Sequence, residues 1–397
     1  MTDLTSATSA TGVGKPDPST NQTSVGGPGT VRPRVAVLFG GRSSEHAVSC
    51  ASAAAVLRAI DRKAYDVVPI GVARDGRWVL VEDDPERLEL TASQVPEVDR
   101  AGTGVLVPMT IDDRELRVLP PGEAPRELGD VDVVFPLLHG PWGEDGTLQG
   151  MLDLADLRYV GSGVLASAVG MDKHYMKTVF GSHGLPMGDY AVITDRDWRR
   201  DPEAVLAGIE SLGLPVFVKP ARAGSSVGIT RVAEAAGLRP AIEAAREHDP
   251  KVLVEAEIRG REIECAVLEG RGVDPPRTSE VAEIRVVGGH DFYDFDAKYL
   301  SESEVELDCP AKLPDGVADE VRRLAAAAFT ALGCEGLARV DCFYTDAGEV
   351  VINEINTMPG FTPHSMYPRM WAVSGLPYQA LIDELITLAL QRRVGLR

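Results

Sequence analysis

Residues 336–359 read GLARVDCFYTDAGEVVINEINTMP, and this stretch predicts a β-hairpin. One strand is expected from Leu337 to Tyr344 and the second from Glu349 to Asn356. The four residues between them, Thr-Asp-Ala-Gly at 345–348, are typical of a turn. Because charged and amide side chains recur in both strands, the hairpin is also a candidate functional site.

The polar residues of the hairpin are spaced to share a face. Side chains two positions apart point the same way from a strand, so Arg339 lies with Asp341, and Glu354 lies with Asn356. If the two polar faces coincide, three oxygen ligands and a guanidinium converge, and burying the carboxylates costs several kcal/mol without compensation. Such hard oxygen ligands suit Mg²⁺, but an internal ion pair of Arg339 with Asp341 or Glu354 explains the same residues equally well. Apolar side chains are expected to fill the opposite face: Val340, Cys342, Val351 and Ile355.

The composition of the whole chain restricts its class. The 397 residues, 44% of them hydrophobic, are enough for two or three domains. The net charge of −20 without a basic stretch predicts no nucleic-acid partner. The sequence contains no run of about 18 apolar residues, so no transmembrane helix is predicted. The five cysteines lack metal-ligand spacing, which predicts buried thiols in a reducing compartment. Residues 1–30 are rich in Ser, Thr, Gly and Pro, so we expect a disordered tail.

The region that follows the tail predicts an open α/β sheet. In such sheets ligands bind beyond the carboxyl ends of the strands, where this chain carries the loops 40–49 and 139–146. The Gly40-Gly41 pair lacks the GxGxxG spacing of a dinucleotide site, which weakens that interpretation. Residues 83–130, rich in charge, Pro and Gly, are expected to form a polar β-meander. Three strands and one helix are predicted for this sheet: 35–39, 65–70 and 131–138 for the strands, and 49–60 for the helix.

A phosphate-binding loop is predicted in the middle of the chain. Residues 219–228, KPARAGSSVG, place small residues between a lysine-bearing strand and an alternating strand, so backbone N–H groups can approach phosphate oxygens closely. The loop is not a Walker A motif, since it lacks Gly-Lys-Ser/Thr and a strand follows it. A flexible hairpin tip is the competing interpretation. The flanking elements are a helix that opens at 171–173 and strands at 190–193, 216–219 and 252–255.

Taken together, these stretches resemble the ATP-grasp superfamily and, in more detail, the D-alanine–D-alanine ligase family. The resemblance runs from about Val35 to the C-terminal helix, and its most discriminating short stretch is FYDFDAKY at 292–299. It implies an α/β protein of three domains, with an N-terminal Rossmann-like open sheet and ATP clamped between central and C-terminal α+β domains. The implied boundaries are 1–30 for the tail, 31–172 for the N-terminal domain, 173–262 for the central domain and 263–397 for the C-terminal domain with the lid loop and metal site.

The resemblance implies how two substrates would be held. Glu45 falls on the glutamate that binds the ammonium group of the first D-alanine, and His139 falls near the same substrate. Ser365 and the amide of Met366 fall on the groups that hold the carboxylate of the second substrate. A surface glutamate and a turn histidine are the structural alternatives for the first pair. The chain departs from many family members at Ala47, where they have an acidic residue.

The resemblance also implies a lid and an oxyanion hole. Arg339 and the amide of Gly360 would stabilise a tetrahedral oxyanion. Lys298 would neutralise phosphate charge, and Tyr299 would hydrogen-bond Ser225, which in turn reaches Glu45. This network would exclude water from a reactive intermediate. Members of the family that use D-lactate tend to lack this tyrosine pattern, so its presence favours an amine nucleophile.

ATP and two Mg²⁺ ions, with Mn²⁺ as a substitute, are the cofactors that the resemblance implies. The metal ligands would be Asp341, Glu354 and Asn356. Many members have a lysine in place of Ala256, so adenine recognition there is expected to rest more on backbone groups. The nucleotide contacts fall on Lys173, Lys219, Ser225, Ser226, Glu255, Ala256, Ile258, Glu262, Phe292 and Lys298.

The implied activity is the ATP-dependent joining of two D-alanines through a D-alanyl phosphate, for peptidoglycan precursor synthesis. By the same resemblance we expect a cytoplasmic homodimer with no nucleic-acid or membrane partner. Two alternatives remain open. A ligase of the same fold would use D-serine or D-lactate as its second substrate, whereas a regulatory protein that keeps the fold would bind ATP without turnover.

Overall fold

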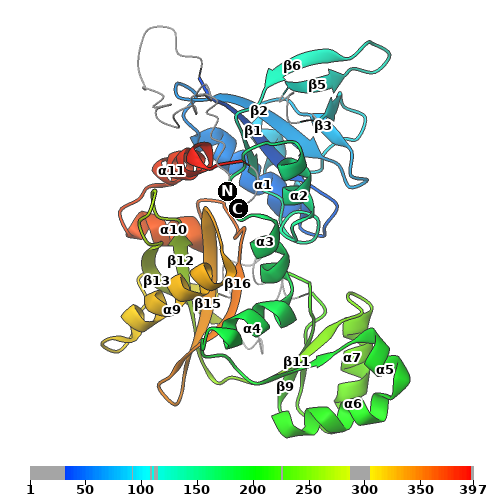
Figure 1. The fold of residues 1–397 in the computed structure, drawn as a ribbon, viewed down its shortest axis with the longest axis vertical. Helices are drawn as coiled ribbons and strands as arrows, with labels where there is room; N and C mark the ends of the chain where they lie inside the picture. The colour runs from blue at the N-terminus through cyan, green and yellow to red at the C-terminus, as the bar shows by residue number, and fades with distance from the viewer. Residues whose placement is uncertain are drawn as a thin grey trace, which may run out of the picture. The chain divides into compact units, whose positions relative to one another are not determined.

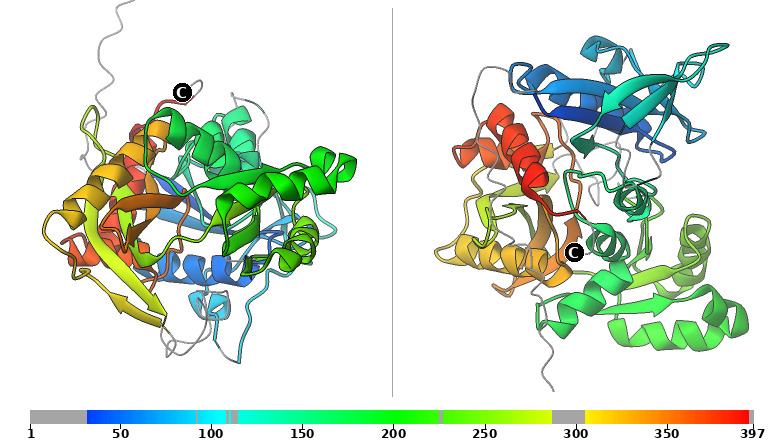
Figure 2. Two further views of the ribbon diagram at one scale, coloured as in Figure 1. Left: turned by 90° about the horizontal axis from the view of Figure 1, so that it is seen from below. Right: turned by 45° about the horizontal axis from the view of Figure 1, so that its top comes forward.

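The computed structural model describes residues 32–91, 93–107, 110, 115–224, 227–286 and 305–394 (Figures 1 and 2). Its named strands form three sheets that use successive parts of the chain, 34–136, 190–256 and 260–356. The residues from Pro33 to Arg397 group as one compact unit. The predicted tail lies outside the described residues, and the predicted boundaries between the three domains stay predictions.

The first sheet has parallel strands at one end, as expected of the open α/β sheet that the sequence predicts. Strand β1 (Arg34–Gly40) pairs in parallel with β2 (Asp66–Val72) and with β7 (Val133–Pro136), and α1 (His46–Ala59) connects β1 to β2. Because these strands run in the same direction, the loops after β1 and β7 leave from the same edge of the sheet. The antiparallel strands that come between β2 and β7 in the sequence extend the sheet on the other side of β2, which confirms the predicted meander. The remaining elements of this region are β3 (Trp78–Leu80), η1 (Pro85–Leu88), β4 (Gly104–Leu106), β5 (Glu115–Leu119), β6 (Arg126–Asp130), α2 (Thr147–Leu154) and α3 (Val164–Met171).

The second sheet has four antiparallel strands in the order β10-β9-β11-β8. Its helices pack their apolar residues onto it to form a separate core, in which Trp198 and Ile242 are buried. The predicted strand through Val227 and Ile229 begins later, at Thr230. The elements are β8 (Tyr190–Ile193), α5 (Asp195–Arg200), α6 (Pro202–Ile209), η2 (Glu210–Leu212), β9 (Val216–Pro220), β10 (Thr230–Val232), η3 (Ala235–Gly237), α7 (Leu238–Arg246) and β11 (Val252–Ala256).

The third sheet has the order β14-β13-β12-β15-β16, and the predicted hairpin forms its β15–β16 edge (Figure 1). Helix α9 (Val317–Leu332) packs on this sheet through its Ala and Leu residues. Helix α4 (Lys173–Ser182) contributes Met176 and Phe180 to the same core. The other elements are β12 (Gly260–Leu268), β13 (Arg277–Val286), β14 (Val305–Asp308), β15 (Leu337–Thr345), β16 (Val350–Asn356), α10 (Met366–Val373) and α11 (Tyr378–Gln391).

One prediction for the hairpin is wrong. Val351 was expected in the apolar face, but it is half-buried, and Ile352 is the residue that is fully buried in the core. The register pairs Asp341 with Glu354 and Cys342 with Ile352, so Asn353 is an extra residue in β16. A β-bulge of this kind shifts the alternation of side chains by one position, which a strict period of two cannot anticipate.

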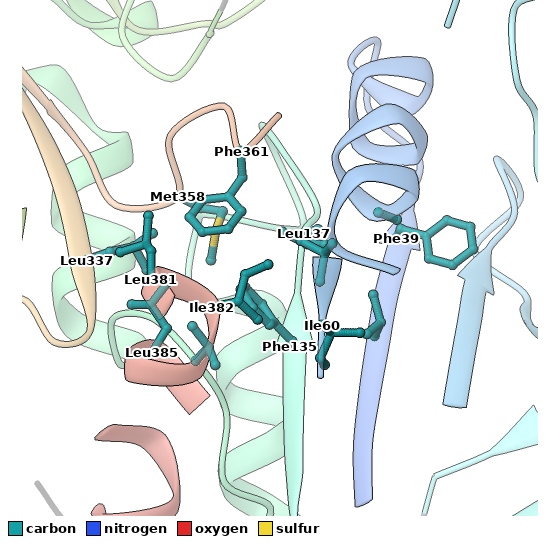
Figure 3. Close-up of a cluster of buried hydrophobic side chains, with 14 of the residues drawn as sticks. Phe39, Ile60, Phe135, Leu137, Leu337, Met358, Phe361, Leu381, Ile382 and Leu385 are labelled. Atoms are coloured by element: carbon teal, nitrogen blue, oxygen red, sulfur yellow. The ribbon is translucent and has the colours of Figure 1, made fainter. Parts of the chain in front are cut away.

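The first and third sheets share one hydrophobic core (Figure 3). Phe135 of β7 meets Phe361, whose ring lies 5.7 Å away in an edge-to-face arrangement. Leu381 and Leu385 of α11 and Met358 belong to the same cluster. The loop that follows β16 is therefore fixed against the first sheet.

Two predictions about the chain as a whole can be compared with this structure. None of the described helices is long and apolar enough to cross a membrane. All five cysteines are free thiols, and four of them are buried while Cys309 is half-buried. The prediction of buried thiols is thus confirmed for four of the five cysteines.

Candidate active site

The polar side of the β15–β16 hairpin brings together the residues that the sequence singles out. Asp341 lies opposite Glu354, and Arg339 lies opposite Asn356. Arg339 Nε and Nη2 donate to the two oxygens of Asp341, each at 2.7 Å, and Asn356 Nδ2 donates to Asp341 at 3.0 Å. Glu264 of β12 places a further carboxylate oxygen 3.2 Å from Arg339 Nε. The ion pair that the sequence allows for Arg339 is therefore formed with Asp341.

The oxygen donors of the hairpin also fit a divalent cation. Asp341, Glu354 and Asn356 come from facing positions of two neighbouring strands, and hard cations accept carboxylate and amide oxygens. In the part of the chain that the structure describes, no group of three His, Cys, Asp or Glu residues could hold a metal. A cation on this hairpin would thus need Asn356 together with oxygens from outside the protein, as Mg²⁺ commonly does with phosphates.

Lys173 links the hairpin to the predicted phosphate loop. It is the first residue of α4, whose N-terminus is capped by the carboxylate of Asp172. Its Nζ lies 3.2 Å from Glu354 Oε2 and donates to the carbonyl of Ala223 at 3.1 Å. Burial alone would lower the pKa of Lys173, but the charge of Glu354 and its hydrogen bond outweigh burial, and the pKa is raised. Lys173 is therefore a fixed positive charge between the loop and the hairpin.

Lys219 and Glu255 form a buried ion pair in the second sheet. They lie on neighbouring strands, β9 and β11, and Lys219 Nζ contacts Glu255 Oε2. The other carboxylate oxygen of Glu255 lies 3.2 Å from the Nζ of Lys177, a residue of α4 that sequence analysis missed. Burial lowers the pKa of Lys219. Burial would raise the pKa of Glu255, but the charges of the two lysines together lower it.

Glu45 lies where three loops meet. It immediately precedes α1, which begins at His46 rather than at the predicted Ser49, and its side chain is buried. A Cβ atom on Gly140, whose φ is +75°, would lie 2.5 Å from Glu45 Oε2, and one on Gly224 would lie 3.2 Å away. The carboxylate of Glu45 therefore sits against the loop after β7 and against the predicted phosphate loop.

The backbone of Met358 is held by two side chains of the loop after β7. His139 Nδ1 lies 3.1 Å from the Met358 carbonyl, and Glu144 Oε1 accepts from the Met358 amide at 3.2 Å. The other ring nitrogen of His139 lies 3.1 Å from Ser52 Oγ, and the other Glu144 oxygen accepts from the amide of Gly140. Both ring nitrogens of His139 are thus engaged with protein groups. Glu144, which sequence analysis did not single out, joins this loop to the loop after β16.

The loop after β16 is organised around Ser365. Its Oγ accepts from the amide of Thr362 at 3.1 Å and lies 2.9 Å from Thr362 Oγ1. A Cβ on Gly360 would lie 3.1 Å from Ser365 Oγ, so the Gly360 backbone and the Ser365 hydroxyl are neighbours. Met366 begins α10, and the N-terminus of a helix favours negative charge. These positions suit the predicted binding of a carboxylate.

The predicted adenine contacts lie at and after the end of β11. Glu255 and Ala256 are its last two residues, and the Ala256 amide donates to the carbonyl of Asp189 at 3.0 Å. Ile258 follows and lies close to Gly188. Glu262 is a half-buried residue of β12. The backbone around Ala256 is thus partly used within the protein.

Several predicted residues lie outside the described part of the chain, and their roles stay predictions. They belong to the phosphate loop and to the lid: Ser225, Ser226, Phe292, Lys298 and Tyr299. Gly224, the neighbour of Ser225, does lie beside Glu45, as the predicted contact between Ser225 and Glu45 requires.

Comparison with known proteins gives one consistent result. Residues 34–162 match the family described as D-ala D-ala ligase N-terminus, and residues 179–387 match the D-ala D-ala ligase C-terminus. The chain is 63% identical over 371 residues to a D-alanine–D-alanine ligase of Arthrobacter sp. (strain FB24), covering 93% of this chain and 97% of that protein. It is 60% identical to the one from Kineococcus radiotolerans, covering 92% and 99%.

Solved structures agree with the sequence matches. The VanG D-Ala:D-Ser ligase from Enterococcus faecalis is 37% identical, with a TM-score of 0.77 over 90% of this chain and 100% of that chain. The D-alanine–D-alanine ligase from Coxiella burnetii is 34% identical, with a TM-score of 0.75 over 91% and 94%.

Proposed function

Since the chain belongs to the D-alanine–D-alanine ligase family, we propose that it joins two D-alanines into D-alanyl-D-alanine for peptidoglycan precursor synthesis, converting ATP to ADP and phosphate. The observation that carries the proposal is the contact of Lys173 with both sides of the site. Its ammonium group touches Glu354 of the hairpin and the carbonyl of Ala223 in the phosphate loop. A triphosphate placed between these two elements would meet a positive charge and the predicted metal ligands together.

The first step is the activation of one D-alanine. Glu45 binds the ammonium group of this D-alanine. The carboxylate of the same D-alanine attacks the γ-phosphate of ATP to form an acyl phosphate, and ADP leaves. Lys173 and Lys219 supply positive charge for the phosphates, and both are held in place by glutamates before the nucleotide binds. Asp341, Glu354 and Asn356 would hold Mg²⁺ or Mn²⁺, which would neutralise further phosphate charge.

The second step joins the amine of the other D-alanine to the acyl carbon, with release of phosphate. Ser365 and the amide of Met366 bind the carboxylate of this acceptor, and Arg339 with the Gly360 amide stabilises the oxyanion. Arg339 is held by Asp341 and Glu264, which fixes the orientation of its guanidinium plane. His139 and Glu144 contact the backbone of Met358 and thereby fix the loop that carries Gly360.

Two parts of the proposal rest on the family resemblance alone. We propose that two copies of the chain form a homodimer and that they act in the cytoplasm, where ATP is available. The oligomeric state is tested by light scattering of the purified chain, and a monomer at catalytic concentrations would contradict it.

The activity is tested by measuring phosphate release from Mg²⁺-ATP across a panel of D- and L-amino acids. We expect release with D-alanine and little with L-alanine, and a product with the mass of the dipeptide. ATP binding without phosphate release on adding D-alanine would instead support the regulatory alternative. Since one similar structure is a D-Ala:D-Ser ligase, the products formed with D-serine and D-lactate are identified in the same experiment.

A further inference from the structure

Lys177 is a buried lysine in the region proposed to bind ATP, and the reaction outlined above gives it no part. It lies on α4 one helical turn after Lys173, so the two side chains project from the same face of the helix. The Lys177 side chain is only 3% exposed. Burying an ammonium group costs several kcal/mol unless a partner compensates it, so its environment requires an explanation.

The anionic partner of Lys177 is shared with a second lysine. Lys177 Nζ lies 3.2 Å from Glu255 Oε1, while Lys219 Nζ contacts Glu255 Oε2. The Lys177 ammonium also lies 5.6 Å from the centre of the Tyr190 ring. Glu255 is therefore fixed between one lysine from α4 and one from the neighbouring strand β9.

The charges of this cluster do not cancel. Lys173, Lys177 and Lys219 bring three positive charges, and Glu255 and Glu354 bring two negative charges, so one positive charge remains. Without Lys177 the same groups would be neutral, and Glu255 would have Lys219 as its lysine partner. A neutral cluster attracts a polyanion less, and Lys219 would have to leave Glu255 uncompensated in order to reach a phosphate.

We propose that Lys177 is a positioning residue for nucleotide binding: it holds and compensates Glu255, so that Lys219 can exchange Glu255 for a phosphate oxygen of ATP. This inference rests on the proposed function, because it assigns Lys177 to the same ATP site. It explains why α4 buries a second lysine against Glu255, one helical turn after Lys173.

The test is a double-mutant cycle on Mg²⁺-ATP affinity, measured by calorimetry on the full chain. Lys177→Met keeps the length of the side chain and removes its charge. We expect ATP binding to weaken roughly tenfold or more, as for one carboxylate charge left uncompensated near the phosphates at an effective dielectric constant of about 20. The KM for ATP should rise by a similar factor, whereas the KM values for D-alanine should change little. Lys177→Arg should bind ATP nearly as the wild type does.

The cycle is completed in a Glu255→Gln background. If Lys177 acts through Glu255, Lys177→Met should weaken ATP binding by no more than about threefold once the carboxylate is gone. The matched control is Lys63→Met, which removes the same charge from an exposed turn and should leave ATP affinity unchanged. Melting temperatures without nucleotide confirm that each variant is folded, and Lys177→Gln replaces Lys177→Met if that variant does not fold.

Two outcomes overturn the inference. One is wild-type ATP affinity for Lys177→Met, and the other is an equal loss of affinity in both backgrounds, which would mean that Lys177 acts without Glu255. Failure of the proposed function has a different signature, since the wild-type chain itself would then release no phosphate with D-alanine, whether or not it binds ATP.

Discussion

Glu144 is half-buried, and the charge of Glu45 acts on its carboxyl group. Burial raises its pKa to about 8, and the charge of Glu45 adds to this effect. A carboxyl group whose pKa is raised on folding stabilises the folded state below its ordinary pKa of 4.5, and this stabilisation is lost as the pH rises towards 8. The wild-type protein is therefore less stable near neutral pH than at pH 4.5, because desolvation disfavours the charged form of this half-buried carboxyl group.

Glu144→Gln should remove this pH dependence, because the amide has nearly the same shape and cannot ionise. The amide nitrogen of Gln cannot accept one of the two backbone hydrogen bonds that Glu144 accepts, so we expect the variant to melt below the wild type at pH 5. Relative to the wild type, the variant should gain several degrees between pH 5 and pH 8. Thermal unfolding of both proteins at the two pH values checks this. A difference in melting temperature that does not vary with pH would contradict the raised pKa.

Which single residues could be predicted from the sequence depends on the range of their contacts. Arg339, Asp341, Glu354 and Asn356 were found because they lie within one hairpin, where alternation alone predicts which side chains meet. Glu144 contacts Met358, which is 214 residues away in sequence, and no local pattern reports that distance. Lys177 did leave a signal, its spacing of four residues from Lys173, but a lysine at that spacing is equally typical of an exposed helix face.

At the scale of secondary-structure elements, the hairpin places its carboxylates by means of a bulge. Because Asn353 is an extra residue in β16, Glu354 can pair with Asp341 while Ile352 and Ile355, three positions apart, are both buried in the core. The sequence predicted the strands and the turn of this hairpin closely. It did not predict β12 and β13, the strands beside it, because most of their residues are buried and their apolar and charged side chains do not alternate clearly.

Glu354→Gln tests the role of this element. The substitution removes one charge opposite Asp341 and beside Lys173, so we expect phosphate release to fall on the order of 10²-fold and to require more Mg²⁺. Steady-state rates measured across Mg²⁺ and Mn²⁺ concentrations check this, and the melting temperature should change by only a few degrees. The matched control is Asp346→Asn in the exposed turn of the same hairpin, which should be silent. Unchanged turnover with unchanged Mg²⁺ dependence for Glu354→Gln would remove Glu354 from the metal site.

At the scale of the whole molecule, the three sheets do not have equivalent cores. The first and third sheets share apolar residues through α11 and Phe361 (Figure 3). The second sheet instead packs its helices into a core of its own. The sequence predicted an α/β protein of three domains that ends in a C-terminal helix. It did not reveal that α11 lies in the core of the first and third sheets, because amphipathic periodicity shows which face is buried but not the partner.

Arg392, which follows α11, provides a polar link between the same two sheets. Its side chain is 6% exposed, and Nη1 donates to the carbonyls of Tyr159 at 3.1 Å and Gly161 at 2.7 Å. Nη2 donates to Glu269 at 2.9 Å, and Nε lies 3.5 Å from Glu335 Oε1. The guanidinium thus joins the segment after β7 to the third sheet's connecting loops.

Arg392→Met should weaken the whole compact unit and not only the end of the chain. Removing one partner of a buried, hydrogen-bonded ion pair leaves the carboxylate and the carbonyls without it, so we expect a loss on the order of 3 kcal/mol in the free energy of unfolding. Urea denaturation of the full chain measures it. The control is Arg323→Met, whose side chain is 62% exposed and paired with Glu320, and which should cost at most about 0.5 kcal/mol. If both variants lose equally little, the shared apolar core alone holds the two sheets together, and Arg392 only closes the end of α11.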